Sequence, residues 1–174
     1  MKTLLVSALA ISLAGTALIA QTTPAREASA SSSPSPVKAM PFVAKAGASD
    51  LYEIQSSQLA EKQGKSAKVK SFAAMMIEHH MMTTKEVVAA ARAAGLAPAP
   101  PALEPAQAAM IAELRPLSGA AFDRAYLTQQ KKAHAMALEL HQTYASDGDM
   151  LQLKAAANKA VPIVQHHIAE LESM

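Results

Sequence analysis

The chain has 174 residues, a formal net charge of +2 at pH 7, six histidines and no cysteine. Without cysteine, the protein can form neither disulfides nor a thiolate metal site. Aromatic residues make up only 3% of the chain and no long run of like charges occurs, so the sequence lacks the features of a nucleic-acid-binding surface.

The N-terminal segment is predicted to be an export signal. Lys2 precedes an uncharged apolar stretch, residues 4–19, which has the length of a signal peptide and is short for a membrane span. Cleavage is expected after Ala20 or after Ala30, and residues 1–20 are taken as the signal; an uncleaved anchor is the alternative. We expect an exported protein of a bacterial periplasm or outer envelope, with no transmembrane span once the signal is removed.

A linker and one domain are predicted to follow. Residues 21–38 are rich in Ser, Pro and Ala, a composition that cannot bury a core and therefore predicts disorder. Residues 41–172 have the length of one ordinary domain. Alanine is abundant there and β-branched or aromatic runs are scarce, which favours helices over a sheet.

Four long helices are expected in this domain. They are placed at about 41–62, from after Ser66 to Ala94, from after Ser118 to the break at Ser146, and from an Asp149 cap to about Leu171, with a Pro-rich crossover at 98–105 and a short helical segment ending at Arg115. Short links within each pair and a long link between the pairs predict two helical hairpins. The expected fold is an all-α, ferritin-like four-helix bundle.

Several polar side chains fall on the apolar faces of these helices. His80 and His167 lie within the predicted seams of their helices, His134 lies beside its seam, and Glu53 lies on a face of small residues. Burying an unpaired carboxylate or imidazole is costly, so these groups need partners. The sequence leaves two interpretations open: a metal site, or an interhelical hydrogen-bond cluster that is purely architectural.

A run of methionines and histidines surrounds the first of these groups. Residues 75–82 contain two imidazoles, four thioethers and one carboxylate. Imidazole with thioether suits copper, whereas imidazole with carboxylate suits zinc, iron or nickel; methionine also simply fills irregular cores. The accessory ligand candidates are His79, His166, Met75, Met76 and Met82.

Standard di-iron chemistry is not expected. Di-iron bundles carry Glu-x-x-His motifs on two helices, but the residues three before His80 and His167 are Ile77 and Val164. An oxidoreductase using a bound metal is therefore the least favoured hypothesis, and no nucleophile arrangement or cofactor fingerprint occurs. We expect no enzyme activity, although the sequence leaves this open.

The ordered fragments of the chain resemble a known family. These fragments are Glu53-Ile54, Val69-Lys70-Ser71-Phe72-Ala73, Phe122-Asp123-x-Ala125-Tyr126-Leu127, Leu153-Lys154 and Pro162 with His167 five residues later. They resemble the exported, ferritin-like domain of unknown function numbered four-one-four-two, whose members are described as periplasmic or outer-membrane proteins. The resemblance implies the fold, export and the positions Glu53, His80, His134 and His167, but it implies no activity.

The chain departs from that family pattern at two places. His79 stands where relatives commonly have Asp, and His166 is an additional imidazole. The Met-Ile-Glu-His-His segment also resembles a second exported four-helix family suspected of copper handling. The sequence thus predicts a bundle that binds a divalent transition metal or copper through Glu53, His80, His134 and His167. The alternative is a structural or stress-related envelope protein, and the oligomeric state is not indicated.

Overall fold

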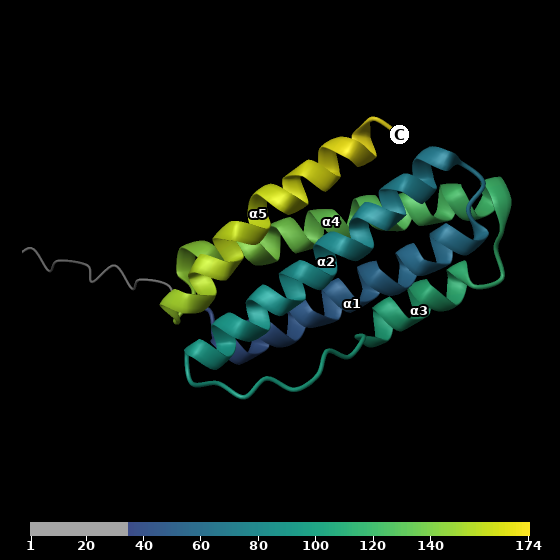
Figure 1. Ribbon diagram of the computed structural model, residues 1–174. Helices are drawn as coiled ribbons and strands as arrows, with labels where there is room; N and C mark the ends of the chain where they lie inside the picture. Colours follow the sequence, from purple (N-terminus) through teal and green to yellow (C-terminus); the bar gives the residue numbers. More distant parts are fainter. Residues whose placement is uncertain (1–34) are drawn as a thin grey trace, which may run out of the picture. The chain divides into compact units, whose positions relative to one another are not determined.

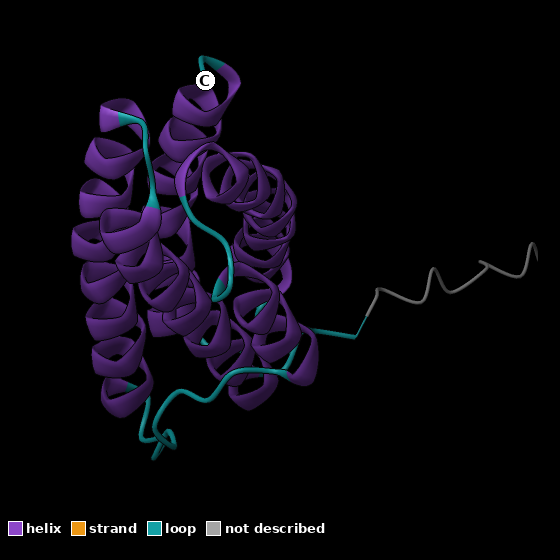
Figure 2. Cartoon of the chain, turned by 90° about the vertical axis from the view of Figure 1, so that its right-hand side faces the viewer, coloured by secondary structure: helices purple, strands orange, loops and turns teal. Residues whose placement is uncertain are grey.

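The computed structural model describes residues 35–174, which are built from helices joined by loops (Figures 1 and 2). The helices are α1 (Ala39–Gln63), α2 (Ala67–Ala93), α3 (Pro105–Leu114), α4 (Gly119–Asp147) and α5 (Leu151–Glu172). The predicted signal peptide and most of the predicted linker lie outside the described residues. None of the described helices is long and apolar enough to cross a membrane.

The four long helices form two antiparallel hairpins that pack side by side (Figure 1). The first hairpin is α1 with α2 and the second is α4 with α5; α1 lies against α4 and α2 against α5. The crossover leads to the short α3, which lies alongside α1. A Cβ at Gly47 would come within 3.2 Å of Pro101, so glycine permits this crossover to approach α1 closely. The predicted all-α, ferritin-like bundle is confirmed.

At one end of the bundle, a residue of the second hairpin caps a helix of the first. The carboxylate of Asp123 accepts hydrogen bonds from the backbone N–H groups of Lys65 and Ser66, at 3.0 and 2.9 Å. Ser66 occupies the N-cap position, as the predicted start of this helix implies, but its hydroxyl makes no capping hydrogen bond. The carboxylate of Asp123 satisfies N–H groups at the start of α2 instead.

At the other end, the segment before α1 is tied to the α4–α5 turn. The N–H of Val37 donates to the carbonyl of Asp147 at 2.8 Å, and its carbonyl accepts from the N–H of Asp149 at 3.1 Å. Val37 was assigned to the linker by composition, but these bonds order the backbone before α1. Asp149 does not cap α5 as expected; the cap position is Met150, and Asp149 accepts a hydrogen bond from the Tyr144 hydroxyl at 3.1 Å.

The core consists of two apolar clusters separated along the helices by a polar layer. One cluster joins the start of α1 to the end of α2 and includes Phe42, Val87, Tyr144 and Leu153. The other joins the end of α1 to the start of α2 and includes Phe72, Met76, Phe122, Tyr126 and Leu171. The buried polar residues between them are Asp50, Glu53, Ser56, Ser57, His80, Thr83, Gln130, His134, His141 and His167.

Candidate metal centre

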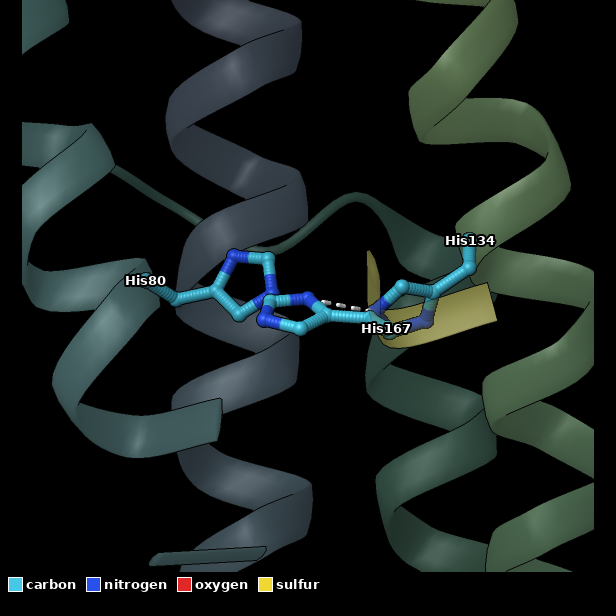
Figure 3. A group of neighbouring side chains, drawn as sticks. All are labelled: His80, His134 and His167. Atoms are coloured by element: carbon cyan, nitrogen blue, oxygen red, sulfur yellow. Dashed lines mark hydrogen bonds between the residues drawn. The ribbon is translucent and has the colours of Figure 1, made fainter. Parts of the chain in front are cut away.

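Three imidazoles from three helices converge in the polar layer (Figure 3). His80 comes from α2, His134 from α4 and His167 from α5, and all three are buried. One ring nitrogen of each lies within 4.8 Å of the corresponding nitrogens of the other two. The sequence analysis named these three histidines as candidates, and the fold brings them together.

His80 is oriented by a buried carboxylate on α1. Its Nδ1 donates to Oδ1 of Asp50 at 2.8 Å, and the hydroxyls of Thr83 and Thr84 donate to Oδ2 of the same carboxylate at 3.0 and 2.8 Å. The Asp50 carboxylate is therefore well satisfied and fixes the imidazole ring. The Nε2 of His80 is buried and has no hydrogen-bond partner among the described residues. It is the nitrogen left for a ligand.

His134 is oriented by the backbone of its own helix. Its Nδ1 lies 2.9 Å from the carbonyl oxygen of Gln130, and because a carbonyl can only accept, the proton must be on Nδ1. Nε2 then carries a lone pair. Oε1 of Glu53 lies 3.7 Å from the same Nδ1, which is too long for a hydrogen bond. Glu53 therefore stands on the side of the ring away from the lone pair.

His167 links the buried layer to the protein surface. Its Nε2 lies 2.8 Å from Nδ1 of the half-buried His79, and the two rings stack with centroids 5.1 Å apart. Its Nδ1 lies 3.3 Å from Nε2 of His134, the contact drawn as a dashed line in Figure 3. One nitrogen of each imidazole is thus held by Asp50, Gln130 or His79; the second nitrogens of His134 and His167 contact each other, and that of His80 has no partner among the described residues. This is the arrangement in which second partners orient metal-ligating histidines.

Glu53 lies beside the three nitrogens rather than among them. Its side chain is fully buried, and neither carboxylate oxygen has a hydrogen-bond partner of good geometry among residues 35–174, although the Gln130 side chain lies near enough to lower its pKa. Burial raises the pKa of this carboxyl group to about 7, although the nearby His80 works against the rise. Sequence analysis placed Glu53 in the ligand set; its position supports a role as a neighbouring negative charge.

The environment keeps two of the imidazoles neutral. Burial, with a further contribution from the charge of His80, lowers the pKa of His134 to about 4 and that of His167 to about 2. Burial also lowers the pKa of His80, but the hydrogen bond and charge of Asp50, with the charge of Glu53, outweigh it and raise that pKa above 6.5. His134 and His167 are therefore neutral at neutral pH, whereas the raised pKa of His80 favours its protonated form. Because Nε2 of His134 carries a lone pair, Nδ1 of His167 donates to it, and binding an ion through that Nδ1 would require the proton of His167 to move to Nε2.

The donor set fits a transition-metal ion. Three imidazole nitrogens at metal–nitrogen distances of about 2.0 Å in a tetrahedral site lie about 3.3 Å apart. The His134–His167 contact already has this separation, at 3.3 Å. The other nitrogens would close in by no more than about 1.5 Å from their largest present separation of 4.8 Å. Three nitrogens also leave a fourth coordination position for solvent or another ligand.

The accessory candidates lie outside the three-nitrogen cluster. Met76 is buried in an apolar cluster against which Met75 packs. Met82 and His166 are exposed, and His79 contacts the cluster only through its hydrogen bond to His167. Met76 is thus a core residue, and the other four form a separate group near the surface.

Three further buried polar residues of this layer were not predicted as site residues from the sequence. Asp50, Gln130 and His141 are all buried, and the first two orient His80 and His134. The sequence pattern predicted an apolar face of α4 through Phe122, Tyr126, Ala133, Ala137, Leu140 and Tyr144; four of these are buried, but Ala133 and Leu140 are only partly buried. The buried residues are Phe122, Tyr126, Gln130, His134, Ala137, His141 and Tyr144. A further step of four residues from Tyr126 leads to Gln130, and the row then continues through His134 and His141.

Three solved structures share this fold at low sequence identity. A DUF305 fragment from Deinococcus radiodurans has a TM-score of 0.68 and 16% identity, covering 80% of this chain and 97% of that one. A DUF305 protein from Streptomyces coelicolor has a TM-score of 0.63 and 12% identity, covering 75% and 86%. CopM in its Cu(II)-bound form has a TM-score of 0.65 and 13% identity, covering 79% and 95%.

These likenesses support the helical architecture described above. Among curated proteins, none matches the sequence significantly. The sequence profile of the domain of unknown function DUF4142 matches residues 22–174, so that the chain belongs to this family.

Proposed function

We propose that the protein binds one divalent transition-metal ion in the polar layer through Nε2 of His80, Nε2 of His134 and Nδ1 of His167. The convergence of three buried ring nitrogens within 4.8 Å of one another carries this proposal. These are the nitrogens not engaged by Asp50, Gln130 and His79. Each ring is thus already oriented for ligation before an ion arrives.

Buried carboxylates would balance the charge of the ion. A divalent cation in the interior needs negative charge close by, because desolvating it alone is prohibitive. Asp50 hydrogen-bonds the His80 ring and Glu53 lies 3.7 Å from the His134 ring. Glu53 has no hydrogen-bond partner of its own among the described residues, and a nearby cation would supply the compensating charge.

Copper(II) is the first ion to test. Imidazole sites bind divalent ions of the first transition row with affinities that peak at copper. The fold neighbour CopM is described in its Cu(II)-bound form, which supports the same choice, and zinc suits three imidazoles almost as well.

We also infer export, because the predicted signal peptide agrees with the description of the Streptomyces neighbour as a candidate secreted protein.

One observation favours the architectural alternative. His79, His167, His134 and Gln130 are already connected by contacts of 2.8, 3.3 and 2.9 Å. Such a series of contacts could fix the register of α2, α4 and α5 without any ion. Nε2 of His80 does not take part in these contacts, has no partner among the described residues, and is better explained by a ligand.

Calorimetric titration of copper(II) and zinc(II) into the mature protein without a His tag tests the proposal. His134→Ala should abolish stoichiometric binding. His141→Ala is the matched control, since His141 is buried on the same face of α4 but contributes no nitrogen to the cluster. Circular dichroism verifies that both variants remain folded. No binding to wild type, or equal binding to both variants, would leave only the architectural role.

A further inference from the structure

Along the outer edge of the α2–α5 seam, which is the solvent-facing side of the contact between these helices, three pairs of residues show which parts of the two helices lie opposite one another. Near one end, Nζ of Lys159 lies 3.0 Å from Oε2 of Glu86. About one turn further along α2, Met82 and Ile163 line the same shallow groove, whose volume is about 130 Å³. One turn beyond that, His79 contacts His167 at 2.8 Å. The antiparallel helices therefore bring residues near 79 on α2 next to residues near 166 on α5.

This edge collects soft donors that the interior site does not use. Met75, His79 and Met82 are spaced by four and then three residues, so they share one face of α2. The side chains of Met75 and His79 are half-buried, and that of Met82 is 45% exposed. His166 on α5 is exposed, and its ring centroid lies 6.2 Å from that of His167.

The central imidazole of this group, that of His79, is held in place by His167 of α5. Nδ1 of His79 is engaged by Nε2 of His167, which fixes the ring and leaves Nε2 of His79 for an outside ligand. A preoriented imidazole between two thioethers is a donor set for a soft, monovalent ion rather than for a hard divalent one. We propose that Met75, His79 and Met82, with His166 from α5, form a second metal site that binds copper(I) at the outer edge of the α2–α5 seam.

The hydrogen bond between His79 and His167 couples this outer site to the interior one. A neutral imidazole carries one ring proton. If His167 binds an interior ion through Nδ1, its proton is on Nε2 and must be donated to Nδ1 of His79. If His79 binds an outer ion through Nε2, its own proton is on Nδ1 and points at His167.

Both sites cannot be filled while this hydrogen bond persists. Two ions at once would place two N–H groups face to face across a 2.8 Å contact. Occupancy of either site therefore weakens the other. This coupling rests on the proposed interior site, whereas the outer site does not.

Silver(I), which mimics copper(I) without redox chemistry, tests the outer site on the full-length mature protein with ¹³C-methyl-labelled methionine. Addition of silver(I) should shift the methyl signals of Met75 and Met82. It should leave those of Met81 and Met136, which are 60% and 62% exposed but off this face, in place. Met82→Leu should weaken silver(I) binding at least about tenfold, and Met136→Leu should not. Equal shifts at all four methionines, or no effect of Met82→Leu, would overturn the outer site.

Zinc(II) tests the coupling. Protein saturated with zinc should bind silver(I) at least about tenfold more weakly than the metal-free protein, and His134→Ala should remove this difference. Unchanged silver(I) affinity in zinc-loaded protein would refute the coupling. Failure of zinc(II) and copper(II) to bind at all would refute both the interior site and the coupling, while the methyl shifts would still decide the outer site.

Discussion

At each end of the bundle the four long helices meet through large apolar side chains, whereas at mid-length they meet through carboxylates, imidazoles, hydroxyls and an amide. In the end clusters, burial and packing of apolar side chains stabilise the folded state. The middle layer leaves the Glu53 oxygens and Nε2 of His80 buried without partners within residues 35–174, which destabilises the folded state. The ends therefore hold the fold together, and the middle is arranged for something other than stability. Substitutions in the two regions should accordingly have opposite consequences.

The largest effect is expected at an apolar end. Phe122 is fully buried and stacks on Tyr126, with ring centroids 5.9 Å apart. Phe122→Ala should lower the free energy of unfolding by about 3–5 kcal/mol in urea titrations. Met136→Ala, an exposed change on the same helix, should stay within about 0.5 kcal/mol of wild type. Similar losses in both variants would show that the end cluster does not hold the bundle.

In the middle layer, removing a polar group should stabilise the metal-free protein. Glu53→Met replaces an unpartnered buried carboxyl group by an apolar side chain of similar length. At pH 8, above the Glu53 pKa of about 7, the free energy of unfolding should rise by about 1–3 kcal/mol. Metal affinity should fall in the same variant, because a compensating charge is lost. If Glu53→Met instead destabilises the metal-free protein, the conclusion that the polar layer costs stability is wrong.

The pH dependence of stability checks the origin of that gain. The Glu53 pKa rises from 4.5 to about 7 on folding, so its stabilising contribution is present below pH 4.5 and is lost as the pH rises through about 7. His134 acts oppositely, since its pKa falls from 6.5 to about 4 and its contribution is lost as the pH falls through about 4. Glu53→Met should therefore give a steeper rise in stability between pH 4.5 and 6.5.

Metal binding should release a proton from His80. Its pKa is raised, whereas His134 is already neutral above about pH 4. At pH 6, calorimetry in buffers of different ionisation enthalpy should show at least about one proton released per ion, because the Glu53 carboxyl group, with a pKa of about 7, must also ionise to balance the charge. The affinity should fall at least about tenfold per pH unit of further acidification. Binding without proton release would exclude His80 as a ligand.

The smallest effect is expected at the helix cap. Asp123→Ala removes the acceptor for two backbone N–H groups at the start of α2 and should cost about 1 kcal/mol of unfolding free energy. Metal affinity should be unchanged, because the cap lies at the end of the bundle, away from the polar layer. Asp123→Asn, which keeps a carbonyl oxygen, should recover part of the loss. Altered metal affinity in Asp123→Ala would show that this end also positions the site.

The sequence predicted those features that depend on one helix at a time. The faces containing His80 in α2 and His167 in α5 were correct, because each has a single apolar row with larger side chains. The face of α4 was correct only in part, because alanine is frequent around this helix and neighbouring rows differ little in hydrophobicity. The roles of Asp50 and Asp123 depend on which helix lies opposite, and spacing within one helix does not contain that information.

The Pro-rich crossover has a mechanical consequence for a chain without cysteine. His80 and Asp50 belong to the hairpin before the crossover, and His134 and His167 to the hairpin after it. An interior ion would link the two hairpins reversibly and close long loops, as a disulfide does in many exported proteins. Protein cut within the crossover would keep its halves together more firmly with the ion than without it. Tolerance of proteolysis would then depend on metal supply.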